Sequence, residues 1–221
     1  MLDFIRIACA VPAVRVGDTA KNAEDICAYI EKADGERADI VLFPELALTG
    51  YTCQDLFFQD TLWTGVQQGI RKIADCTKDH PNVTAAVGLP VRTGMRMYNC
   101  AAVISRGKIH ALVPKTYIPN YNEFYEKRWF SSGAEVTEDM AELLGEPVPI
   151  LPRAVFRVGG TLLGVEICED MWTPLPPSTF LALNGAEVIL NLSASNETIG
   201  KRAYRRELVQ HQSAALNCVY A

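Results

Sequence analysis

Short apolar runs recur along this chain and alternate with segments of helical periodicity. The clearest runs are DIVLF at residues 39–43 and EVILNL at residues 187–192. In neither run do apolar and polar residues alternate, as they do in a strand with one face exposed to solvent. Strands of this kind are buried on both faces, as in sheets covered by helices or by another sheet. The pattern therefore predicts an α/β fold.

Nine segments are predicted to be strands, and two pairs of them form hairpins, around Arg106-Gly107 and Gly159-Gly160. Since these strands are too many for one small sheet, we expect one domain over residues 1–221, with two mixed β-sheets flanked by helices. The predicted strands are residues 4–11, 39–43, 83–91, 98–105, 108–113, 154–158, 162–168, 187–192 and 217–221.

Helices are expected between several of these strands. The first begins at Asp18 or Thr19 and carries an apolar stripe at three- and four-residue spacing. A polar, aromatic loop is expected from Pro114 to about Gly133, and an irregular segment over residues 134–152. The other predicted helices are residues 61–77, 179–184 and 200–216.

Composition excludes several classes of protein. The 221 residues carry 21 Lys and Arg against 26 Asp and Glu, a net charge of −5 with no basic block, so we expect no nucleic-acid partner. The apolar runs are too short to cross a membrane, and the start MLDFIRIACAV lacks the features of a secretory signal. The seven cysteines form no CxxC pair, which predicts free thiols, no zinc site and a cytoplasmic location.

Three reactive side chains follow apolar strands, where α/β folds build their sites. Glu45 lies among apolar neighbours in FPELALTGY, so it is either a general base with a raised pKa or an exposed loop glutamate. Lys115 in VPKTY either stands beside developing negative charge or ends a hairpin at the surface. Cys168 in GVEICEDMW is either a nucleophile or a buried thiol.

A fourth segment, LNLSAS, ends the strand at residues 187–192. Ser193 and Ser195 there either hydrogen-bond a ligand or cap the following helix. The three histidines, His80, His110 and His211, are expected to be structural, because none forms an obvious pair with a cysteine. A cysteine nucleophile would then need a carboxylate as its base, and a cation such as Lys115 to lower its pKa beside the acids that follow it.

The order of Glu45, Lys115 and Cys168 resembles the nitrilase superfamily of carbon–nitrogen hydrolases, whose signature is a Glu–Lys–Cys triad at strand ends. FPELALTGY, VPKTYIPNYNEFYEKRWF, GVEICEDMW and LNLSAS match the motifs of that family in order and span essentially the whole chain. The resemblance implies an α-β-β-α sandwich. It also implies that Glu45 is the base, that Cys168 forms a thioester, and that Lys115 stabilises the oxyanion together with the backbone N–H of the next residue.

The resemblance further implies supporting residues. Glu123 matches a second glutamate that positions the substrate and the lysine. Substrate contacts are expected from Tyr51, Tyr121, Glu169, Trp172 and Ser195. Glu169 and Ser195 are the candidates for the α-amino and α-carboxylate groups of the substrate, and Trp172 is either a stacking wall or a core aromatic.

Within the superfamily, YIPNYNEFYEKRWF and GVEICEDMWTPLPPS are similar to the amidase domains of glutamine-dependent NAD⁺ synthetases. The resemblance implies glutamine as substrate, no cofactor in this domain and a homo-oligomer. It also implies that residues 1–221 stop before the family's last strands and before a synthetase domain that uses ATP and Mg²⁺. The alternative is a free-standing amidase acting on another small amide, of the ω-amidase or N-carbamoyl hydrolase type.

Overall fold

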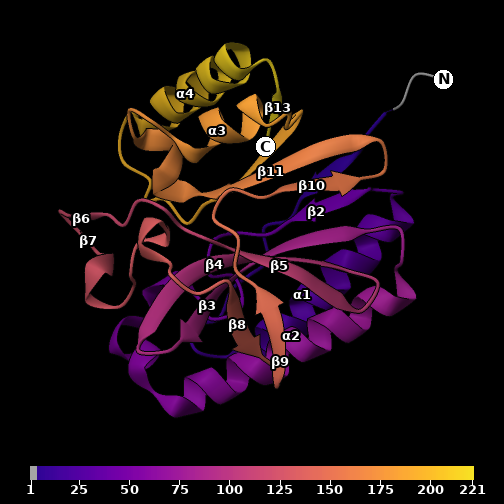
Figure 1. The fold of residues 1–221 in the computed structure, drawn as a ribbon, viewed down its shortest axis with the longest axis vertical. Coiled ribbons are helices and arrows are strands. Elements are labelled where there is room, and N and C mark those ends of the chain that lie inside the picture. Colours follow the sequence, from indigo (N-terminus) through magenta and orange to yellow (C-terminus); the bar gives the residue numbers. More distant parts are fainter. Residues whose placement is uncertain (1–3) are drawn as a thin grey trace.

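The computed structural model describes residues 4–221 and shows four layers, with two β-sheets packed face to face between two pairs of helices (Figure 1). Residues 1–3, which open the segment expected to lack a secretory signal, lie outside the described residues. The prediction of two mixed sheets flanked by helices is therefore confirmed. No helix among residues 4–221 is both long and apolar enough to span a membrane.

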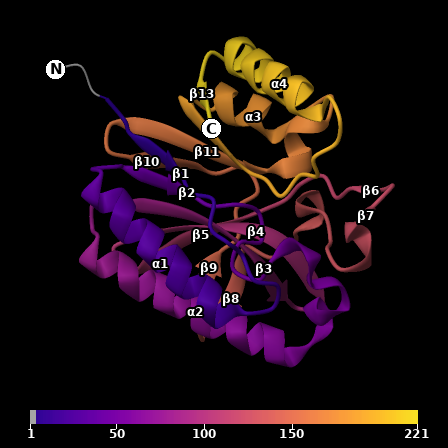
Figure 2. The same ribbon diagram turned by 180° about the vertical axis from the view of Figure 1, so that it is seen from behind.

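The first sheet has the order β1-β2-β3-β4-β5. Strands β1 to β3 run parallel, and β4 and β5 follow as antiparallel hairpin neighbours. Parallel neighbours need crossover helices, which α1 and α2 supply on the outer face of this sheet (Figure 2). The elements are β1 (Ile7–Cys9), α1 (Thr19–Gly35), β2 (Ile40–Leu42), α2 (Asp60–Asp79), β3 (Thr84–Thr93), β4 (Arg96–Ser105) and β5 (Lys108–Pro114).

The second sheet has the order β10-β11-β12-β13 and is covered by α3 and α4. Strands β11, β12 and β13 are parallel, and β10 pairs antiparallel at the edge. The elements are β10 (Val155–Val158), β11 (Thr161–Ile167), α3 (Pro177–Leu183), β12 (Val188–Leu192), α4 (Lys201–Leu216) and β13 (Val219–Tyr220). Short 3₁₀ helices lie in the connections between these elements, namely η1 (Tyr51–Phe58), η2 (Glu126–Arg128), η3 (Gly133–Glu135) and η4 (Cys168–Trp172).

The apolar strands are buried because both faces of each sheet are covered. Ile40 and Val103 of the first sheet meet Val165 and Leu190 of the second in the layer between the sheets. A second cluster joins the stripe on α1, which the sequence predicted, to α2 and the outer face of the first sheet. Burying each such side chain contributes about 1.5–3 kcal/mol, so the two sheets are held firmly in register.

Two segments differ from the expectation of irregular structure. Residues 134–152 contain a hairpin of β8 (Met140–Leu143) and β9 (Glu146–Pro149), which buries Ala141, Leu143 and Val148. Its turn places Leu144 as well as Gly145 at positive φ, and leucine at such a position gives no turn signal in a sequence. The predicted loop at residues 114–133 contains a small hairpin of β6 (Asn120–Tyr121) and β7 (Phe124–Tyr125).

Gly88, in the middle of β3, lets the segment after β2 cross the sheet at close range. A Cβ atom there would lie 2.3 Å from the backbone nitrogen of Leu46 and 2.5 Å from the carbonyl oxygen of Pro44. The Gly88 carbonyl also accepts a hydrogen bond from the Leu48 N–H at 3.1 Å. The backbone on either side of Glu45 is thus seated directly on β3.

Gly88→Ala is expected to lower the free energy of unfolding by about 1–3 kcal/mol, because rigid backbone on both sides must move. Urea denaturation followed by circular dichroism measures the change. Gly35→Ala is the matched control, since a Cβ atom there has nothing within 4 Å, and it is expected to be neutral or slightly stabilising. Equal stability of Gly88→Ala and the wild type would contradict the close approach.

Candidate active site

Glu45, Lys115 and Cys168 come together between the two sheets. Glu45 follows β2 through Phe43 and Pro44, Lys115 directly follows β5, and Cys168 directly follows β11. Their exposed fractions are 2%, 1% and 8%. The structure therefore brings the three candidates to one buried place. Glu45 and Lys115 are not in the exposed setting that their segments alone allowed, whereas the burial of Cys168 agrees with both of its alternatives.

Lys115 is held between two carboxylates. Its Nζ donates to Oε1 of Glu45 at 2.7 Å and to both carboxylate oxygens of Glu126, at 2.7 and 2.9 Å. Burial by itself would lower the pKa of Lys115, but the negative charge of the neighbouring carboxylates, that of Glu45 first, outweighs burial, and the pKa is raised. Lys115 is thus a permanent cation in a region without water contact.

Glu126 takes the position that the family resemblance gave to Glu123. The expectation for Glu123 is corrected, because its carboxylate accepts a hydrogen bond from Asn196 and does not reach Lys115. The hairpin β6–β7 explains the difference. Glu123 lies in its turn, whereas the Glu126 N–H bonds to the Pro119 carbonyl at 3.1 Å where the hairpin closes, and its side chain is buried.

Two further groups hold Glu45. The amide Nδ2 of Asn99 donates to Oε1 at 2.7 Å, and the backbone N–H of Ala194 donates to Oε2 at 3.1 Å. Ala194 follows β12, so the second sheet contacts Glu45 directly. Asn99 was not among the predicted site residues, although an asparagine inside the apolar strand YNCAAVIS was a usable signal, because a buried amide needs a partner.

Cys168 opens η4 in a left-handed backbone conformation, with φ +46°. This conformation is costly for a residue with a Cβ and turns the side chain out of the strand direction. Burial and the neighbouring charge of Glu45 raise the pKa of its thiol, and Lys115 acts in the opposite direction. The raised pKa means that the thiol is protonated at neutral pH, so nucleophilic attack by its sulfur would require a base.

Asp170 ties the lysine segment to the cysteine segment. Its carboxylate accepts from the backbone N–H groups of Thr116 at 3.1 Å, Tyr117 at 2.8 Å and Ile167 at 3.0 Å. Burial raises the pKa of this buried carboxyl to about 7. Thr116 and Tyr117 directly follow Lys115, and Ile167 directly precedes Cys168. Asp170 therefore fixes the distance between the segments that carry Lys115 and Cys168.

The two tyrosines expected to contact the substrate, Tyr121 and Tyr51, bond to different glutamates. Tyr121 is half-exposed and donates its hydroxyl to both oxygens of Glu169, at 2.9 and 3.0 Å. Tyr51 instead donates to Oε1 of Glu126 at 2.7 Å, so it supports the charged group around Lys115. Phe124 packs edge-on against both tyrosine rings.

Trp172 and Ser195 lie on the α4 side of the site. The ring of Trp172 packs on Tyr204 with centroids 5.6 Å apart, and the Lys201 ammonium stands 5.1 Å from the centre of the Trp172 ring. Within residues 4–221 the Ser195 side chain makes no hydrogen bond, whereas Ser193 donates to Asn191 at 2.6 Å. Lys201 was not among the candidates, and it adds a cation beside the tryptophan.

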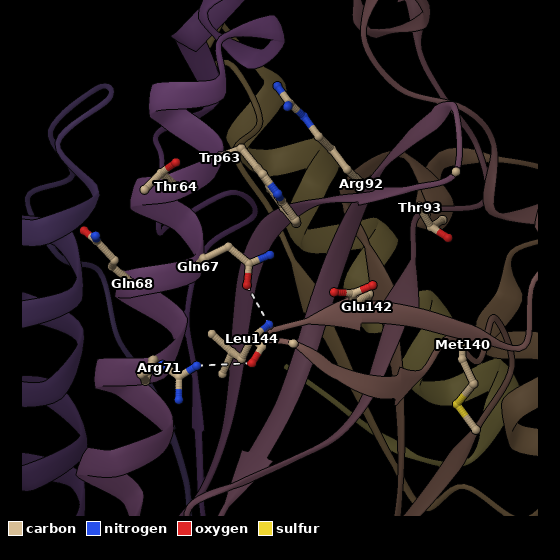
Figure 3. Close-up of a pocket in the computed structure, with 12 residues that line it drawn as sticks. Trp63, Thr64, Gln67, Gln68, Arg71, Arg92, Thr93, Met140, Glu142 and Leu144 are labelled. Carbon is tan, nitrogen blue, oxygen red and sulfur yellow. Dashed lines mark hydrogen bonds between the residues drawn. The ribbon is translucent and has the colours of Figure 1, made fainter.

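Two open pockets are relevant to the choice of site. One of about 700 Å³ is lined by residues after β5 together with Tyr121 and Glu169. Its lining includes Thr116 and Glu169, the sequence neighbours of Lys115 and Cys168, but none of the three triad residues. A larger pocket of about 920 Å³ lies between α2 and the β8–β9 hairpin (Figure 3). Its polar side chains hold that hairpin, since Gln67 accepts from the Leu144 N–H at 2.6 Å and Arg71 donates to the Leu144 carbonyl at 3.2 Å.

The remaining titratable candidates lie elsewhere. His80 pairs with Asp34 at 3.0 Å, and His110 with Ser105 at 2.8 Å, both away from the triad. In residues 4–221 no group of three or more His, Cys, Asp or Glu side chains is arranged to hold a metal ion.

The sequence profile described as "Carbon-nitrogen hydrolase" matches residues 6–221. The chain belongs to the carbon–nitrogen hydrolase family. This membership agrees with the grouping of Glu45, Lys115 and Cys168 and with the four-layered fold. Members of the family hydrolyse carbon–nitrogen bonds.

Relatives of this carbon–nitrogen hydrolase include glutamine-dependent NAD(+) synthetases. That of Mycobacterium leprae is 37% identical over 220 residues, 99% of this chain and 32% of the relative. That of Xylella fastidiosa is 37% identical over 214 residues, 96% of this chain and 36% of the relative. The chain thus spans about one third of the length of these relatives.

Solved structures agree on the fold. A glutamine-dependent NAD(+) synthetase from Cytophaga hutchinsonii superimposes with a TM-score of 0.85 at 29% identity, over 99% of this chain and 35% of that one. An amidase from Nesterenkonia sp. AN1 superimposes with a TM-score of 0.78 at 21% identity, over 99% of this chain and 77% of that one. The second likeness extends the shared fold to an amidase of much shorter length.

The arrangement of charges predicts how Glu45→Gln changes the thiol. Because the charge of Glu45 raises the pKa of Cys168, its removal lowers that pKa. The pH midpoint for alkylation of Cys168 by chloroacetamide is therefore expected to move down. Lys115→Met removes the opposing cation and is expected to move the midpoint up. Peptide mass spectrometry at a series of pH values measures both.

Cys9, the exposed cysteine, is the internal control in the same samples, and its midpoint is expected to be the same in all three proteins. A midpoint for Cys168 that stays fixed or rises in Glu45→Gln would show that Glu45 does not act on the thiol.

Proposed function

We propose that this chain hydrolyses the side-chain amide of glutamine through a thioester on Cys168. The observation that carries the proposal is the burial of Lys115 against Glu45, with the thiol of Cys168 under the influence of both charges. A carboxylate, a thiol and a fixed cation in one dry space support the proposal, because acyl transfer requires a base, a nucleophile and a group that stabilises the oxyanion.

In the first half of the reaction Glu45 takes the thiol proton while the sulfur of Cys168 forms a bond to the amide carbon. Negative charge develops on the amide oxygen, where the Lys115 ammonium and the backbone N–H of Glu169 stabilise it. Glu45 then gives its proton to the nitrogen, the carbon–nitrogen bond breaks, and ammonia leaves. The product is a glutamyl thioester.

In the second half Glu45 removes a proton from water, which attacks the thioester carbon. The carbon–sulfur bond breaks, the thiol recovers a proton, and glutamate leaves. Asn99 and the Ala194 N–H keep the Glu45 carboxylate in one orientation through both halves, since each bonds a different oxygen. The same carboxylate can therefore serve twice.

The groups at the mouth of the site suit an α-amino acid. Glu169, hydrogen-bonded by Tyr121, offers a carboxylate to the α-ammonium group of glutamine. Lys201, beside Trp172, offers a cation to the α-carboxylate, and Ser195 offers a hydroxyl. Charged groups of opposite sign near the Phe124 ring, which packs on Tyr121 and whose centre is 5.9 Å from the Lys201 ammonium, favour a zwitterionic substrate over a simple aliphatic amide.

We further propose that the ammonia serves an amidation that yields NAD⁺. The support is that the relatives named above are glutamine-dependent NAD(+) synthetases of which this chain spans about one third. The ATP- and Mg²⁺-dependent step would then belong to a synthetase domain outside residues 1–221, and the hydrolase domain itself would need no cofactor. A cytoplasmic homo-oligomer is the setting we propose for both activities.

The test is ammonia release from glutamine and from 4-carbamoylbutanoate, which is glutamine without its α-amino group. Glutamine is expected to be the better substrate of the wild type. Glu169→Gln is expected to lower kcat/KM for glutamine about 10- to 100-fold, because a charged hydrogen bond is lost, and to leave 4-carbamoylbutanoate nearly unchanged. Cys168→Ala is expected to lose at least ~10³-fold on both substrates.

Cys9→Ala and Glu207→Gln are matched controls, since both residues are exposed and distant in sequence from the triad motifs, and both variants are expected to keep wild-type rates. Ammonia release that survives in Cys168→Ala would remove the nucleophile from the proposal. A wild type that prefers 4-carbamoylbutanoate or an N-carbamoyl amino acid would assign the site to another small amide.

A further inference from the structure

The structure assigns Asn191, anchored on Glu166, as the positioning residue that sets the backbone of Cys168 for attack. Asn191 lies on β12, where it pairs with Glu166 of β11, two residues before the nucleophile. The inference rests on Cys168 as nucleophile, part of the function proposed above, but not on glutamine as the substrate.

The amide oxygen of Asn191 receives hydrogen bonds from the two segments that enter the site from the second sheet. The backbone N–H of Cys168 donates to it at 3.1 Å, and the hydroxyl of Ser193 donates at 2.6 Å. Ser193 directly precedes Ala194, whose N–H bonds the general base Glu45. A single oxygen atom therefore fixes the position of the Cys168 backbone relative to the segment of Ser193 and Ala194, which holds Glu45.

The amide nitrogen of Asn191 is fixed on the opposite side. It donates to Oε1 of Glu166 at 3.4 Å and to the hydroxyl of Tyr220 at 3.2 Å, and that hydroxyl donates to the same Glu166 oxygen. A carboxylate only accepts hydrogen bonds, so the amide cannot turn over. Turning it would leave the nitrogen facing the Cys168 N–H, donor against donor.

Glu166 is itself buried and has no cation beside it in the described part of the chain. It is 1% exposed, and its second oxygen accepts from the Ser178 N–H at 2.7 Å. A buried carboxylate held by three uncharged donors is costly to keep, and β11 would be packed as well by an apolar residue. Holding Asn191 in one orientation is a role that accounts for its presence.

The left-handed backbone of Cys168 is the feature that needs this support. A residue with a Cβ at φ +46° relaxes toward an ordinary conformation unless its neighbours hold it. The hydrogen bond from its N–H to Asn191 is the contact on the strand side of that turn. Without it we expect the sulfur to move away from the line of attack while the substrate pocket stays intact.

The experiment compares Asn191→Leu, which keeps the shape of the side chain without its polar atoms, with the exchange pair Asn191→Asp plus Glu166→Gln. In the pair, the new aspartate still accepts from the Cys168 N–H. In the hydrogen bond between positions 191 and 166 the glutamine becomes the donor and the aspartate the acceptor, and the net charge is unchanged. We expect Asn191→Leu to lower kcat about a hundredfold with KM nearly unchanged, since the reacting atom is misplaced and no substrate contact is lost. The pair is expected to recover most of that loss.

Val188→Ala is the matched control, because Val188 lies on the same strand and in the core between the sheets but does not touch Asn191 or Cys168 by hydrogen bonds. It is expected to lower stability and to keep kcat per folded molecule. The rate of Cys168 alkylation by chloroacetamide, read by peptide mass spectrometry, is a second readout and is expected to fall only in Asn191→Leu.

Full kcat and alkylation rate in Asn191→Leu, or equal losses in Val188→Ala, would overturn the positioning role. If Asn191→Leu does not fold, the exchange pair decides, because failure of the folded pair to approach the wild-type rate also overturns it. Slower alkylation in Asn191→Leu, in a chain that does not hydrolyse glutamine, would keep the positioning role and reject the substrate.

Discussion

The ion group of Lys115 with Glu45 and Glu126 is the constraint on which the rest of this structure depends. Charges removed from water are costly, and removing one partner of a buried pair typically costs 3–5 kcal/mol. The group is held because both carboxylates have further hydrogen bonds, from Asn99 to Glu45 and from Tyr51 to Glu126. The two sheets exclude water from it, which makes these charges strong enough to act on a thiol and an amide.

Burial, together with the charge of Glu45, raises the pKa of the Glu126 carboxyl to about 7. Burial and the charge of Glu45 keep the pKa of Cys168 raised, and burial with the charges of Glu126 and Glu45 does the same for Tyr51. A protonated thiol beside a carboxylate differs from the thiolate–imidazolium pairs of many cysteine enzymes. In the mechanism that we propose, the proton moves only when the amide carbon is present to share the charge of the sulfur, so attack and deprotonation belong to one step.

The apolar strands sufficed to predict the layers, because strands such as DIVLF indicate burial on both faces. The triad was predicted from the family resemblance, since each of its three segments alone left a structural alternative open. Glu45, Lys115 and Cys168 are each fixed within three residues of a strand end, so little freedom remains for their placement. The α1 stripe was equally informative, because its spacing alone defines the buried face.

The contacts that the sequence did not reveal depend on turns and on rotations of side chains. Glu123 lies in the turn of the β6–β7 hairpin and Glu126 directly follows that hairpin, and only its closure decides which of them faces Lys115. The β8–β9 hairpin was missed because its turn uses a leucine at positive φ. Asn191 of β12 and Glu166 of β11 are paired on neighbouring strands, and the sequence of neither strand predicts that register.

The measurement that tests the central claim most directly is the mass of the Cys168 peptide after rapid acid quenching of the protein with glutamine. A covalent intermediate predicts that this peptide carries a glutamyl group as a thioester, that hydroxylamine removes the group, and that no other cysteine peptide carries it. Turnover of glutamine with an unmodified Cys168 peptide at every quench time, or a glutamyl group on a different residue, would contradict the account.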